Sequence, residues 1–121
     1  MIQKLEINGV HYDINDELYK YIVKKIGKLD QYMTRHVRQS AHAEVKIKEN
    51  KIKTRVQSTC EVILHLPHEV MMTKETTLNP YAAVDIVEAK LKNQLKKYKE
   101  KHTPRLHRRL LSKLKRRTNQ D

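Results

Sequence analysis

The chain has 121 residues, 33% of them charged and 38% hydrophobic, and a formal net charge of +12. This length fits one domain with a small core of aliphatic side chains and tyrosine, because Phe and Trp are absent. No apolar run approaches a membrane span, no secretory leader pattern stands at the start, and the lone Cys60 has no disulfide partner, so we expect a cytoplasmic protein without a membrane segment.

The first quarter of the chain predicts a strand followed by a helix. Residues 2–8 set Ile and Leu among polar residues, as in a half-buried strand, and an irregular connector follows. Asn15 is placed to cap a helix from 16 to about 32, with acidic residues in the first turn, where the helix dipole favours anions. Apolar residues at spacings of four and three predict its buried seam: Leu18, Ile22, Ile26, Leu29 and Met33.

The middle of the chain predicts three strands. A connector over 34–39 leads to residues 41–49, where apolar and polar residues alternate. Residues 49–51, Glu-Asn-Lys, suit a hairpin turn, although no glycine supports it. Alternation resumes over 55–66, and a further strand is predicted over 69–77. Because the connections between them are short, these three strands should pair antiparallel.

Residues 79–101 predict a long helix. A cap at Thr77 or Asn79 precedes Pro80, which suits the first helical position. One apolar seam should face the core: Val84, Val87, Leu91, Leu95 and Tyr98. The half before Lys90 carries acids, the half after it carries mostly lysines, and the helix should end near residue 101.

The element order β-α-β-β-β-α predicts an α+β fold, a four-stranded sheet with two helices packed on one face. The other sheet face should meet water or a ligand and carries Lys46, Lys48, Arg55 and Gln57. We expect a folded domain over 1–101 and a basic C-terminal tail over 102–121. Leucines at helical spacing in the tail leave two interpretations open, a disordered segment or a helix that forms when bound.

The positive charge is concentrated at one place. Residues 90–117 contain 13 lysines and arginines and a single acid, whereas residues 1–89 are nearly neutral. Like charges four residues apart repel one another along a helix, and a bound anion would relieve that repulsion. The pattern therefore predicts a polyanionic partner, a nucleic acid first and an acidic membrane surface second.

No arrangement typical of an enzyme is recognisable. His65 and His68 alone do not make a metal site, and Cys60 has no identifiable base beside it. Two glycines are too few for a phosphate-binding loop. The strands lack Phe, so base stacking on the sheet is not expected, and contacts to backbone phosphates are favoured. We predict a protein that is not an enzyme and needs no cofactor or metal.

Two stretches resemble a known family. "HYDINDELYKYIVKKIGKLDQYM", residues 11–33, followed by "YAAVDIVEAKLKNQLKKYKEK", residues 81–101, is similar to the ribosome hibernation-promoting factor and ribosome-associated inhibitor A family. The likeness covers roughly residues 1–101 and includes the β-α-β-β-β-α order. Asn93 stands where the family usually has arginine, and Asn79-Pro80 replaces an acidic residue or glycine.

The resemblance implies a ribosome hibernation factor. Such a protein binds the small ribosomal subunit in the channel for mRNA and tRNA, competes with both, and inhibits translation in idle or stressed cells. Both helices would contact rRNA phosphates. Positions matching basic family residues are Lys25, Lys28, Lys90, Lys97 and Lys99, and the charge run adds Lys92, Lys101, Arg105, Arg108 and Arg109.

The tail is the main departure from the family pattern. It is strongly basic and too short for the separate domain by which long family members pair ribosomes, so we expect a short form that is monomeric off the ribosome. The alternative is a peripheral membrane protein, whose leucine-bearing basic tail lies on anionic lipid, or a general RNA-binding protein. Lysines on the helices of the folded domain would argue against the membrane.

Overall fold

The computed structural model describes residues 1–101 and confirms the α+β fold, with the predicted strands and long helices in the predicted order. It also contains two short helical segments between the first helix and the second strand. The elements are β1 (Lys4–Val10), α1 (Asp16–Gly27), the 3-10 helix η1 (Lys28–Tyr32), α2 (Arg35–Ser40), β2 (His42–Ile52), β3 (Arg55–Leu66), β4 (Glu69–Thr77) and α3 (Pro80–Lys101).

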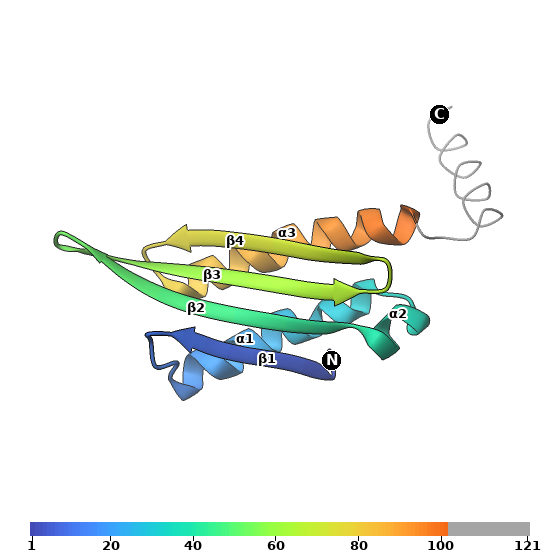
Figure 1. Cartoon of the computed structure of the whole chain (residues 1–121), viewed down its shortest axis with the longest axis horizontal. Coiled ribbons are helices and arrows are strands. Elements are labelled where there is room, and N and C mark those ends of the chain that lie inside the picture. The colour runs from blue at the N-terminus through green and yellow to red at the C-terminus, as the bar shows by residue number, and fades with distance from the viewer. Residues whose placement is uncertain (102–121) are drawn as a thin grey trace, which may run out of the picture.

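The four strands form one mixed sheet in the order β1-β2-β3-β4. Strands β2, β3 and β4 pair antiparallel through short turns, as predicted, whereas β1 runs parallel to β2 and is connected to it through α1. Figure 1 shows α1 and α3 side by side on the same face of this sheet. The fold is therefore two layers, with helices covering one sheet face and leaving the other open.

The core lies between the helices and the covered sheet face. Alternation places Val45 of β2 and Val62 of β3 on that face, where neither side chain is exposed. The predicted seams of both helices are buried against them: Leu18, Ile22, Ile26, Leu29 and Met33, with Val84, Val87, Leu91, Leu95 and Tyr98. Residues at the other phase of the alternation, such as Lys46 and Lys48, are exposed on the open face. Periodicity in the sequence therefore identifies the core correctly.

The first α-helix is shorter than predicted. It ends at Gly27, and the remaining turn to Tyr32 is the 3-10 helix η1. The backbone N–H of Ile2 donates to the Gly27 carbonyl at 2.9 Å, so an acceptor of the regular helical pattern is used by the chain start instead. A short helix, α2, then occupies most of the predicted connector, with its first turn capped by the Thr34 hydroxyl, which accepts from the Val37 N–H.

Two strand boundaries also differ from the predictions. Strand β1 starts at Lys4 rather than residue 2 and continues to Val10, because its parallel pairing with β2 extends to Lys48. The β2–β3 turn falls at residues 53–54 and not at 49–51, since the register pairs Ile52 with Arg55. An asparagine suggested the wrong position, and cross-strand pairing of residues 49–52 overrode this local turn preference.

Candidate nucleic-acid interface

The predicted lysines of α3 lie on two different flanks of the helix. A rotation of about 100° per residue places Lys90, Lys97 and Lys101 on one side of the buried seam and Lys92 and Lys99 on the other. The first flank faces β4, since Lys97 and Lys101 line a hollow of ≈ 330 Å³ together with residues 69–72. The second flank faces η1. The lysines of α3 therefore do not all share one side of the helix, although the sequence presents them as a single run.

Lys90 is held by an acid within the domain. Its Nζ atom forms an ion pair and a hydrogen bond with Oε1 of Glu75 on β4. The Lys90 side chain remains 53% exposed, against 24% for Glu75. A phosphate that binds Lys90 must therefore compete with a carboxylate that already occupies it.

On the other flank, α1 runs in the same direction as α3 and contacts its first half. The Tyr21 and Tyr81 rings meet edge to face with centroids 5.0 Å apart. The Tyr21 hydroxyl donates to Asp85, and this hydrogen bond, with burial and the nearby acids, raises the pKa of Tyr21 to about 12. Lys25 Nζ lies 3.7 Å from Asp85 Oδ1 and 3.7 Å from Glu88 Oε2. The acid-bearing start of α3 thus anchors it to α1.

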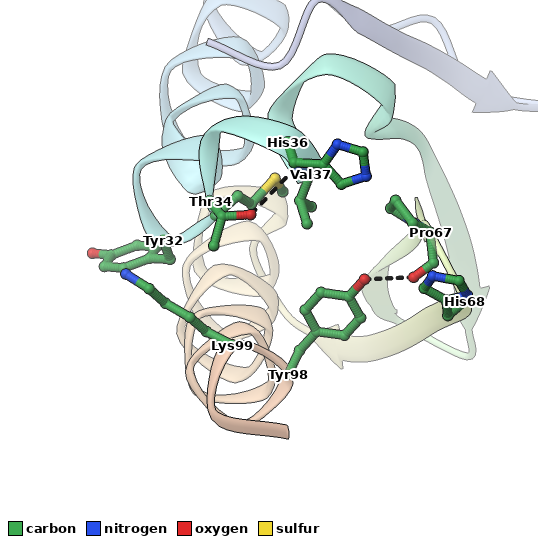
Figure 2. A pocket seen from close by; sticks show the side chains of 9 residues that line it. Tyr32, Thr34, His36, Val37, Pro67, His68, Tyr98 and Lys99 are labelled. Carbon is green, nitrogen blue, oxygen red and sulfur yellow. Dashed lines mark hydrogen bonds between the residues drawn. The ribbon is translucent and has the colours of Figure 1, made fainter. Parts of the chain in front are cut away.

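Further along, α1, η1 and α3 bring four of the predicted lysines to one surface. Lys28 lines a depression of ≈ 150 Å³ with Lys25 and Glu88. Lys92 lies over the Tyr32 ring, 5.3 Å from its centroid, and Figure 2 shows Lys99 beside the same ring. We call this the inter-helix surface: Lys25, Lys28, Lys92 and Lys99.

Tyr32 also belongs to this surface, although the sequence does not identify it as a site residue. The Lys92 ammonium lies over its ring, a face that cations favour, and Lys99 lines the same hollow as the ring. A tyrosine between two apolar positions of a predicted helix carries no sign of this role. Only the packing of η1 against α3 places the ring beside lysines sixty or more residues away.

Helix dipoles explain some of these positions but not all. Lys24 and Lys25 lie in the last turn of α1, and Lys99 and Lys101 in the last turn of α3, where the negative end of each dipole attracts cations. That attraction fades beyond one turn, so it does not account for Lys92 or Lys97. Stabilisation of the helix ends therefore explains the lysines in the last turns, but it does not explain Lys92 or Lys97.

Beyond the lysine-rich end of α3 lies the hollow drawn in Figure 2, with a volume of ≈ 420 Å³. It is bounded by η1, α2, the β3–β4 turn and α3, and the Tyr98 hydroxyl donates to the Pro67 carbonyl across it. His36 and His68 line the hollow, but in the described part of the chain no cluster of three or more metal-ligating side chains occurs. The arrangement fastens the end of α3 to the sheet.

Cys60 and His65, which were also considered from the sequence, both lie in strand β3. Cys60 is fully buried in β3, as expected for a core side chain, and burial raises the pKa of its thiol to about 12. The His65 ring stacks on His42 of the neighbouring strand, with centroids 4.2 Å apart. None of the helices in residues 1–101 is long and apolar enough to cross a membrane. Arg105, Arg108 and Arg109 lie outside the described residues.

Comparison with known proteins gives one family. Residues 5–103 match the family model described as sigma 54 modulation protein / S30EA ribosomal protein. Over 96 residues the chain is 30% identical to the ribosome hibernation promotion factor of Lactococcus lactis subsp. cremoris, covering 79% of this chain and 49% of that protein. The namesake from Staphylococcus aureus is 33% identical over 96 residues, covering 79% and 48%. The chain spans about half the length of these curated relatives.

Two solved structures share the fold. The N-terminal domain of Protein Y from Thermus thermophilus superposes with a TM-score of 0.59 at 24% identity, covering 77% of this chain and 94% of that one. A ribosomal subunit interface protein from Coxiella burnetii superposes with a TM-score of 0.65 at 22% identity, covering 80% and 98%. At this level of identity the likeness supports the α+β architecture.

Proposed function

Because the chain belongs to the sigma 54 modulation protein / S30EA ribosomal protein family, we propose that it is a ribosome hibernation factor. It binds the small ribosomal subunit through rRNA phosphates and inhibits translation in idle or stressed cells. Similarity to relatives named ribosome hibernation promotion factors supports this role. Membership of this family also agrees with the prediction that the chain is not an enzyme.

The observation that carries the proposal is the inter-helix surface. Lys28 begins η1 directly after α1, and Lys92 extends from α3. The helices α1 and α3 are held side by side by the contacts of Tyr21 and Lys25 with Asp85. Lysines fixed on packed helices can meet several phosphates of a folded RNA at once, because their backbone positions require no ordering on binding. The β4-side flank, with Lys97 and Lys101, adds a second row of cations to the same helix.

The finer part of the proposal concerns the place on the ribosome. We propose the channel that mRNA and tRNA use, with direct competition against both, and a monomer off the ribosome. The residues that resemble the family pattern support this placement. The membrane alternative is less favoured for residues 1–101, because lysines stand on α1 and α3 and the apolar seams of these helices are buried against the sheet.

The tail forms a separate part of the proposal. Residues 1–101 would be the ribosome-binding domain and residues 102–121 a basic extension that adds contacts to rRNA. If the tail becomes helical on the ribosome, changing its three spaced leucines to serine weakens binding with every charge kept: Leu106, Leu110 and Leu114. If it acts by charge alone, the serine variant binds like the parent. That the chain is a short form of the family is likewise a proposal.

Sedimentation with purified small subunits tests the core of the proposal. If about six phosphates are neutralised, log K should fall against log salt with a slope of about −4 to −5. Excess initiator tRNA or mRNA should displace the protein, and translation of a natural mRNA should be inhibited in vitro. A flat salt response would contradict binding through phosphates, and binding indifferent to tRNA and mRNA would contradict the channel.

A further inference from the structure

The β2–β3 hairpin extends beyond the rest of the sheet. Pairing of β1 with β2 ends at Lys48, and pairing of β4 with β3 begins at Ser58. Residues 50–57 therefore pair only with each other, and Glu49 pairs with Ser58 at their base. Figure 1 shows this two-stranded segment projecting past the other strands and both helices. We call residues 49–57 the ribbon. Four residues of β2 at about 3.3 Å each give a projection of roughly 13 Å.

The ribbon carries cations on all its sides. Alternation places Arg55 on the open sheet face and Lys51 on the opposite face, while Lys53 stands in the turn. All three are exposed, and none takes part in an ion pair within residues 1–101. Glu49 is the one acid of the ribbon. Cations therefore surround this projection instead of forming one basic face.

The projection of the ribbon does not help to stabilise the described domain. A two-stranded segment alone is only marginally stable in water, yet the ribbon leaves Ile52 54% exposed and Val56 37% exposed. Lys53 adopts a φ of 56°, a left-handed conformation that glycine or asparagine accepts more readily. A glycine would suit the turn better if the turn served only to reverse the chain. A charged side chain at the tip suggests a partner outside the domain.

We propose that the ribbon is a second RNA contact, which enters a groove between two phosphate strands of a folded RNA. The major groove of B-DNA admits a two-stranded ribbon, and in an A-form RNA helix the wide groove is the shallow minor groove, where cations on both faces of a ribbon can meet phosphates of both strands. A ribosomal protein would meet the ribbon on one face and would leave the opposite cations unused. That the RNA is ribosomal rests on the proposed function.

The position of the ribbon makes it a separate site. It lies at the end of the molecule where α3 begins, opposite the lysine-bearing end of that helix (Figure 1). A 22-residue helix spans roughly 33 Å, so one partner that contacts both ends must be large and rigid. A folded ribosomal subunit meets this requirement, whereas a short single strand does not.

Lysines on exposed strands also prevent pairing with strands of other chains. The test must therefore distinguish this protective role from RNA binding. Glutamates prevent such pairing as well as lysines do, but they repel phosphates. The test variant is Lys51→Glu, Lys53→Glu and Arg55→Glu together. The control carries the same charge change on exposed positions of the open sheet face: Lys4→Glu, Lys46→Glu and Lys74→Glu.

Both full-length variants and the parent are titrated against purified small subunits at several salt concentrations. The ribbon variant should bind about tenfold or more weakly than the control, and its salt slope should be shallower by about 2 to 3. Equal losses in the two variants would overturn the ribbon proposal while leaving the proposed function intact. Circular dichroism checks folding, and if the reversals unfold the chain, glutamine at the three ribbon positions should show the same order of binding.

A photoreactive residue at position 52 identifies the class of partner. Adducts with rRNA are expected, and adducts with a ribosomal protein alone would overturn the RNA assignment. Should the parent itself fail to bind the subunit, the proposed function fails, and the ribbon is tested on an RNA duplex of about 20 base pairs. Weaker duplex binding by the ribbon variant than by the control would then support the groove contact, and equal binding would overturn it.

Discussion

Replacing Glu75 with glutamine should strengthen binding to the small subunit. In the free protein the Glu75 carboxylate holds Lys90, and a phosphate can use this lysine only after the ion pair opens. Glutamine keeps the size of the side chain and removes its charge. The substitution therefore makes Lys90 available and removes a carboxylate that would repel the RNA backbone.

The exposure of the pair sets the magnitude. Since Lys90 is 53% exposed and Glu75 24% exposed, the pair should stabilise the domain by at most about 1 kcal/mol. The free energy of unfolding should fall by no more than this. In the parent, RNA binding to Lys90 must first break this ion pair, which costs at most about 1 kcal/mol. Without the pair that cost disappears, so binding should be at most about fivefold tighter. One additional phosphate contact would make the salt slope steeper by up to about 1.

Filter binding or sedimentation between about 50 and 200 mM salt measures the effect. Glu61→Gln, on the open sheet face, is the control for a general change in net charge. A double substitution, Glu75→Gln with Lys90→Gln, should lose the gain, because the lysine that profits is gone. The reasoning is refuted if the Glu75 variant binds no more tightly than the Glu61 variant, or if the gain persists without Lys90.

Leu91→Ala should destabilise the domain by about 2–5 kcal/mol, because Leu91 is fully buried, and urea unfolding measures this loss. Lys97→Glu should leave the urea midpoint nearly unchanged but make the salt slope of subunit binding shallower by about 1; an unfolded variant would contradict its exposed placement. Cys60 should resist thiol reagents at pH 8 in the folded chain, and stability should decline from pH 9 toward 12, since the unfolded thiol ionises first. Removal of residues 103–121 should weaken subunit binding and reduce the salt slope, and an unchanged slope would show that the tail makes no phosphate contact.

The fold was largely predictable because its strands and long helices follow simple periodicities. Val45 and Val62 lie where strand alternation predicts, and Leu91 lies where the helix seam predicts. Helix α2 was not predicted, because six residues around Arg35–Ser40 carry too short a pattern. The hairpin turn was misplaced, because the register of long strands outweighs the preference of a single asparagine.

The candidate site was predictable in composition but not in arrangement. In the sequence, Lys90 and Lys92 are equivalent members of the same run of lysines. Their different surroundings depend on which element packs on each flank of α3, with Glu75 on one side and Tyr32 on the other. These partners are 15 and 60 residues away in the sequence, and no local pattern connects them to the lysines. Tertiary packing alone decides which cation is already neutralised.

The parallel pairing of β1 with β2 has a consequence for the order of folding. Strands β2, β3 and β4 meet neighbours in the sequence, whereas β1 must wait for a partner that begins at His42, beyond α1. Closing this longer loop makes the β1 pairing the slower step, so β1 should dock last and detach first. Its detachment uncovers the edge of β2, a template for strands of other molecules. Partial heating should therefore lead to association through this edge before the α3 packing is lost.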